Sequence, residues 1–99
     1  MSEPERSFEG TITAGHKEHA VEVPFDPASE WGVSLMPIRG GRRGYPVRAT
    51  VASIPLDTFV VARSHKHWLV LGDEALEAIG VLEGDVIAVK VVPRDVANP

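Results

Sequence analysis

Hydrophobic and polar residues alternate with a period of two over much of this chain, which is typical of half-buried β-strands. The first two alternating segments, 7–13 and 20–25, are separated by the polar residues 14–19 and predict a β-hairpin. The residues expected to face inward in this hairpin are Phe8, Gly10, Ile12, Val21, Val23 and Phe25.

Four further segments predict strands, at 46–53, 56–63, 67–72 and 86–92. Ile54 and Pro55 are expected to form the turn between the first two of them. The residues predicted to face inward in the first and last of these strands are Val47, Ala49, Val51, Ile87, Val89 and Val91.

Two short helices are predicted at 26–32 and 73–80. Each begins with an aspartate, a residue suited to the N-cap, and ends with a glycine that can adopt the left-handed conformation. The predicted caps are Asp26 and Gly32 for the first helix, and Asp73 and Gly80 for the second. Residues 33–45 contain several glycines and arginines and predict a long loop.

Six short strands and two helices in this order favour a closed architecture. Short strands expose unpaired edges in an open sheet, and closure into a barrel removes those edges. We therefore predict a mainly β domain over residues 7–92, a small closed or nearly closed six-stranded barrel, with tails at 1–6 and 93–99. A two-layer α+β sandwich is the alternative. Gly84 is expected to take a positive φ in the turn before the last strand, where Asp85 can hydrogen-bond the backbone.

The order of four segments resembles a family of bacterial domains of unknown function. They are FEGTI (8–12), AVEVPFD (20–26), GRRGYPVRATV (41–51) and LVLGDEALEAIGVLEGDVIAVKV (69–91). Members are often found with YdeI/OmpD-associated proteins, and the resemblance implies a double-split β-barrel similar in construction to AbrB-type transcription factors. The family has no established functional residues to carry over. This chain departs from it in an acidic closing helix and in the loop 33–45.

Composition narrows the class of protein. The 99 residues are 43% hydrophobic and 24% charged, which suits one globular domain. The chain has no cysteine, which excludes disulfides, thiolate metal ligands and thiol nucleophiles. Its first residues are polar and acidic, unlike a signal peptide, and no apolar run approaches the roughly 20 residues of a membrane helix. We therefore expect a cytoplasmic protein, a monomer or small homo-oligomer.

Charge is unevenly distributed. Residues 39–66 contain six bases and one acid, a net charge of +5 within a chain of net charge −4. Arginine recognises carboxylate and phosphate through forked hydrogen bonds, and the nearby glycines allow close approach of the backbone. This pattern predicts one electropositive face that binds a small anionic molecule or an acidic protein partner. The residues predicted to bind are Arg39, Arg42, Arg43, Tyr45, Arg48, Arg63 and Trp68.

Other functions have less support in the sequence. Nucleic-acid binding is not expected of an acidic chain with a pI near 5.5, although a DNA-associated regulator is an alternative that the AbrB-like resemblance raises. A small enzyme or resistance factor with a pocket at the barrel mouth is a further alternative function. The serines lack a nucleophile-elbow pattern and no phosphate-binding loop is present, so neither catalysis nor a cofactor is predicted.

Histidine and tryptophan each allow two interpretations. His65 and His67 would point the same way in a strand and are candidates for a metal site, although turn histidines are more commonly solvated. Trp31 and Trp68 could mark a contact surface, but the preferred interpretation is that they fill the ends of the barrel.

Overall fold

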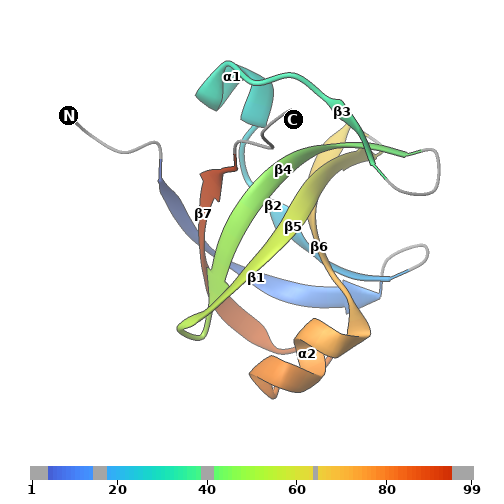
Figure 1. Ribbon diagram of the computed structural model, residues 1–99. Helices are drawn as coiled ribbons and strands as arrows, with labels where there is room; N and C mark the ends of the chain where they lie inside the picture. Colours follow the sequence, from blue (N-terminus) through green and yellow to red (C-terminus); the bar gives the residue numbers. More distant parts are fainter. Residues whose placement is uncertain (1–4, 15–17, 39–41, 64, 95–99) are drawn as a thin grey trace.

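The computed structural model describes residues 5–14, 18–38, 42–63 and 65–94. It consists of seven strands and two short helices over these residues (Figure 1). Their bounds, in chain order, are β1 (Arg6–Ala14), β2 (His19–Val23), α1 (Pro27–Trp31), β3 (Met36–Ile38), β4 (Arg42–Val51), β5 (Ile54–Arg63), β6 (Lys66–Leu71), α2 (Asp73–Ile79) and β7 (Val86–Pro93).

Six of the strands form a closed antiparallel barrel. The order is β4-β5-β6-β2-β1-β7, and β7 pairs with β4 to complete the circle. The predicted closed six-stranded barrel is therefore confirmed. The seventh strand, β3, extends the barrel by pairing with the first residues of β4.

The inner face of the barrel forms the core, and the predicted alternation is confirmed. Val47, Ala49, Val51 and Val91 are completely buried, and the inward residues of β1 and β2 lie beside them. The helices close the two ends of the barrel: α1 and α2 lie at opposite ends in Figure 1. Leu76 of α2 is itself buried in the core.

The caps of α1 form as predicted. Asp26 Oδ1 accepts a 2.9 Å hydrogen bond from the backbone N–H of Ala28, and Gly32 is left-handed with a φ of 67°. Gly80 ends α2 with a φ of 84°, also as predicted. Asp73, however, is not an N-cap, because it is already the first residue of the helix and Gly72 takes the cap position.

The prediction of one continuous loop at 33–45 was wrong, because this region contains β3 and the start of β4. Pairing between these strands, with Met36 opposite Gly44, gives the backbone its hydrogen-bond partners. Gly44 was interpreted as a loop residue. In the structure a side chain at Gly44 would place its Cβ only 3.1 Å from the carbonyl oxygen of Val60, so this glycine allows two strands to pack closely.

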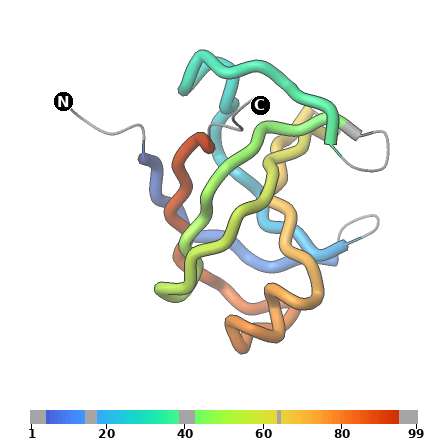
Figure 2. The backbone as a smooth tube through the Cα atoms, in the orientation of Figure 1, coloured from blue at the N-terminus to red at the C-terminus, as the bar shows by residue number. Residues whose placement is uncertain are grey.

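The turn between β4 and β5 also differs from the prediction. It consists of Ala52 and Ser53, whereas Ile54 and Pro55 belong to β5. Proline is tolerated there because β6 pairs with β5 only from Val60 onward, which leaves the first half of β5 as an edge. The β4–β5 hairpin consequently extends beyond β6, and its tip is visible beside β7 in Figure 2.

No helix in the described part of the chain is long and apolar enough to cross a membrane.

Candidate functional site

A groove of about 470 Å³ lies on the outer surface of the barrel, where β1, β7 and the tip of the β4–β5 hairpin meet. All three elements lie side by side in Figures 1 and 2. The polar and small residues that line the groove include Ser7, Glu9, Thr50, Ser53, Ala88 and Lys90.

The central feature of this groove is a row of three polar residues across three neighbouring strands. Lys90 of β7 is directly opposite Ser7 of β1 on one side and Thr50 of β4 on the other. All three point outward, because the strand neighbours of Thr50 and Lys90 are buried and Phe8, next to Ser7, packs against the core. Residues that face each other in this way have Cβ atoms about 5 Å apart. The row therefore places one lysine side chain between two side chains that carry hydroxyl groups.

The ammonium of Lys90 has one ionic contact among the described residues, 3.8 Å from the carboxylate of Glu5. The lysine side chain is 54% exposed, and an exposed pair of this kind is worth little in free energy. An anionic ligand that displaces Glu5 from Lys90, or binds the ammonium beside it, would therefore lose little free energy.

The next row along the same strands is less polar. Glu9 of β1 is opposite Ala88 of β7, and Ala52 on the hairpin turn also lines the groove. Two rows on one face of a strand are about 7 Å apart. The groove thus has a cation and hydroxyls at one position, small methyl side chains beside them and a carboxylate about 7 Å further along.

The turn that borders the groove has an unusual backbone. Ala52 has a φ of 51° and Ser53 a φ of 70°, so both lie in the left-handed region. A two-residue hairpin turn of this type favours Asn-Gly, because the left-handed region costs a residue with a Cβ about 1 kcal/mol or more. Strained backbone of this kind is concentrated at functional sites, and Ser53 lines the groove.

Of the predicted arginines whose side chains the structure describes, Arg48 lies apart from Arg43 and Arg63, which lie at one end of the β4–β5 hairpin. Arg39 lies outside the described residues, and for Arg42 only the backbone at the start of β4 is described. Arg43 is exposed close to that end of β4. Arg48 is opposite Asp57 on β5, whereas Arg63 is six positions further along β5, or about 20 Å.

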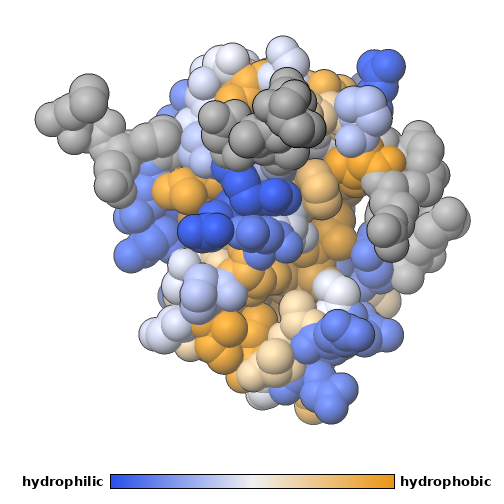
Figure 3. Space-filling model, in the orientation of Figure 1, coloured by the Kyte–Doolittle hydropathy of each residue, from blue (hydrophilic) through white to orange (hydrophobic). Residues whose placement is uncertain are grey.

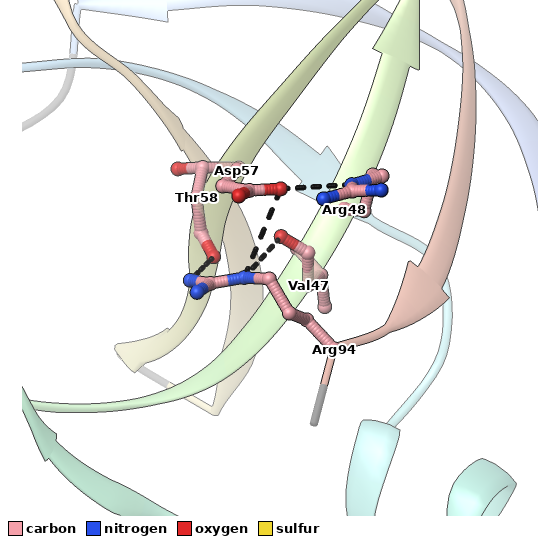
Figure 4. Close-up of polar contacts among 5 residues, drawn as sticks. All are labelled: Val47, Arg48, Asp57, Thr58 and Arg94. Atoms are coloured by element: carbon pink, nitrogen blue, oxygen red, sulfur yellow. Dashed lines mark hydrogen bonds and ion pairs between the residues drawn. The ribbon is translucent and has the colours of Figure 1, made fainter. Parts of the chain in front are cut away.

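Arg48 is part of a polar network that also holds the end of the described chain (Figure 4). Its Nε donates a 2.9 Å hydrogen bond to Asp57 Oδ1, and Arg94 Nε lies 3.9 Å from the same oxygen. Arg94 also donates hydrogen bonds to the carbonyl oxygens of Val47 and Thr58. The hydrogen bond from Arg48, together with the charges of both arginines, lowers the pKa of Asp57. One carboxylate therefore faces two arginines, and this cluster keeps a net charge of +1.

Tyr45 was predicted to contact a ligand at the surface but lies inside the barrel, with 6% of its surface exposed. Burial, with a smaller contribution from the carboxylate of Asp26, raises the pKa of its hydroxyl. Trp68 is on the outer face of β6, opposite Val61 of β5 and Glu22 of β2, and is partly exposed. Trp31 packs against the core, in edge-to-face contact with Phe25 at 5.2 Å between ring centroids.

His65 and His67, the candidates that the sequence offered for a metal site, are in different settings. His65 has a φ of 65° and precedes β6, so the strand geometry expected for the pair does not apply to it. His67 Nε2 lies 3.6 Å from Asp26 Oδ1, and its ring is 6.3 Å from that of Tyr45. Over the residues that the structure describes, no group of three His, Asp or Glu side chains is positioned to hold a metal ion.

Nothing in the sequence pattern groups Ser7, Thr50 and Lys90. Their alternation with buried residues marked each of them as outward-facing. Only the strand register shows that they lie in one row, since Ser7 and Thr50 are both far from Lys90 in the sequence.

These features define a small closed β-barrel with a groove on its outer surface. Residues 8–91 match the family model for a domain of unknown function (DUF1905), and the chain belongs to this family. The resemblance to a family of unknown function is thereby confirmed. No curated protein matches the chain.

Proposed function

We propose that this domain is a non-enzymatic binding module that holds a small anionic molecule in the groove between β1, β7 and the β4–β5 turn. The observation that carries the proposal is the row Ser7, Lys90 and Thr50. One ammonium and two hydroxyls can donate three hydrogen bonds to the oxygens of a carboxylate or phosphate, and charge assistance strengthens the bond from lysine.

The second row supports a more specific ligand. Glu9 can accept a hydrogen bond from an amine or hydroxyl about 7 Å from the bound anion, and Ala88 offers a small apolar surface next to it. A short molecule with a carboxylate at one end and a hydrogen-bond donor at the other fits this arrangement.

The polar groups of the groove support binding rather than catalysis. Ser7 and Lys90 are exposed to solvent, whereas catalytic acids, bases and nucleophiles depend on a desolvated site that shifts their pKa. Arg48 also lies apart from Arg43 and Arg63, which supports a small ligand over an acidic protein or a nucleic acid, because such partners contact several cations on one face.

The acidic protein partner, the DNA-associated regulator and the small enzyme stay predictions from the sequence. The cytoplasmic location, the AbrB-like construction and the association with YdeI/OmpD-associated proteins are likewise predictions from the sequence.

The test is a titration of the isotope-labelled protein, followed by amide NMR, with succinate, 4-aminobutyrate and inorganic phosphate as probes. We expect shift changes in β1, β7 and the β4–β5 turn, strongest for 4-aminobutyrate. Lys90→Met should abolish them. Lys66→Met is the matched control, because Lys66 is equally exposed (55%) but lies on β6, away from the groove.

Three outcomes would contradict the proposal. They are the absence of shift changes with every probe, equal changes in the Lys90→Met variant, and changes centred on Arg43 and Arg63. The last outcome would return the anion site to the basic residues that the sequence predicted.

A further inference from the structure

A second groove, of about 430 Å³, lies at the end of the barrel closed by α2. It is formed by α2, the first residue of β2 and the segment that joins α2 to β7. Its apolar lining consists of Leu76, Val81 and Leu82. Leu82 is 74% exposed, and Val86, just after the same turn, is 66% exposed. Leu82 therefore continues the apolar lining of the groove onto the exposed surface, and contiguous exposed apolar surface is typical of contact sites.

The exposed leucine is held by a well-defined turn. The backbone N–H of Leu82 donates a 2.9 Å hydrogen bond to Asp85 Oδ2, and the N–H of Asp85 donates back to the carbonyl of Leu82. Gly84, with a φ of 94°, donates a 2.8 Å hydrogen bond to the carbonyl of Ile12 in β1. Because its backbone is fixed in this way, Leu82 can be buried by a partner at little additional cost in backbone entropy.

The rim of this groove is acidic. Asp73, Glu77 and Glu83 line it, and the described residues of its lining include no lysine or arginine. His19 lies between two of these carboxylates, with Nδ1 3.4 Å from Asp73 and Nε2 3.5 Å from Glu83. Hydrophobic and strongly hydrophilic surface lie side by side at this end of the molecule in Figure 3.

We propose that this groove docks a basic amphipathic segment of another protein, in which an apolar side chain is flanked by lysine or arginine. The apolar side chain would pack on Leu76 and Leu82, and the cations would face Glu77 and Glu83. Complementary charge of this kind gives both specificity and faster association.

A second copy of this chain fits the groove less well. A two-fold contact through the same surface would bring the three carboxylates of one copy against those of the other, and like charges in contact are repulsive. This surface shares no lining residue with the groove beside Lys90, so the two proposals stand independently.

The test uses a fluorescein-labelled peptide of about twelve leucine and lysine residues in an amphipathic helical pattern. A second peptide carries glutamate in place of lysine. Fluorescence anisotropy should show saturable binding of the lysine peptide and none of the glutamate peptide. Leu82→Asn and the pair Glu77→Gln/Glu83→Gln should each raise the Kd by about fivefold or more.

A matched control removes two carboxylates at the other end of the barrel, with Glu22→Gln/Glu30→Gln. This variant has the same net charge as the groove pair, and its Kd should stay within about twofold of the parent value. Thermal unfolding of each variant confirms that it is folded.

Failure to bind the lysine peptide, or equal weakening in both double variants, would overturn the proposal. So would light scattering that shows a dimer of the parent protein that is lost in Leu82→Asn, because the groove would then hold a second copy.

Discussion

Arg48 and Asp57 face each other across β4 and β5, and a 2.9 Å hydrogen bond joins Arg48 Nε to Asp57 Oδ1. Arg94 approaches the same carboxylate from the end of β7. Asp57 thus contacts two arginines. One of them, Arg48, is among the five arginines predicted to form the electropositive face. The same pairing lowers the pKa of Asp57, so the contribution of this pair to stability depends on pH.

Asp57→Asn should reduce the loss of stability at acid pH. The pKa of Asp57 in the folded protein lies below its ordinary value of 3.8, so the carboxylate contributes stability above that pH. The contribution is lost as the pH falls through the lowered pKa. Denaturation midpoints measured from about pH 2 to 7 should therefore fall less steeply in the variant. Parallel curves for the variant and the parent would show that the pair has no energetic role.

Replacing the β4–β5 turn by an Asn-Gly dipeptide should stabilise the protein. Ala52 and Ser53 are both left-handed, and the double variant Ala52→Asn/Ser53→Gly would adopt the same turn with less strain. We expect a gain of about 1–2 kcal/mol in the free energy of unfolding, measured by chemical denaturation. If the Ser53 hydroxyl contacts the ligand, the same variant should also bind 4-aminobutyrate more weakly. An unchanged or lower midpoint would argue against strain in this turn.

Gly10→Ala should destabilise the barrel by about 1–3 kcal/mol, because the added methyl group would overlap Val21 Cγ1 in the core. Gly72→Ala is the comparison, since a Cβ at Gly72 meets nothing within 4 Å and its φ of −70° suits alanine. The denaturation midpoint should fall for both variants but less for the second, because Gly72→Ala loses only the N-cap preference for glycine over alanine, roughly 0.5–1 kcal/mol. Similar midpoints for both would mean that β1 and β2 can move apart without cost.

Gly84→Ala should lower the free energy of unfolding by about 1 kcal/mol or more through the backbone alone. A Cβ at Gly84 would be in open space, but the φ of 94° is unfavourable for alanine. Denaturant unfolding measures the change directly. A variant as stable as the parent would show that the turn before β7 relaxes to another conformation.

The features that depend only on residues close together in the sequence were predictable from it. The alternation in β1, β4 and β7 identified the buried faces, because successive side chains in a strand point to opposite sides. Asp26, Gly32 and Gly80 identified helix ends, because capping involves residues within one turn. The N-cap of α2 was missed by one residue, since an extended glycine can occupy that position without a side-chain hydrogen bond.

Only the tertiary structure decided what depends on strand pairing. The short strand β3 exists because Met36–Ile38 finds partners in β4, and nothing in its own residues distinguishes it from a loop. The charge of Arg48 counted as free in the sequence until pairing placed Asp57 opposite it. The row of Ser7, Lys90 and Thr50 exists because closure of the barrel sets one register among three strands that are distant in the chain. The local pattern determines which way a side chain points, but the residues that share a site are determined by the register, which is a property of the closed barrel as a whole.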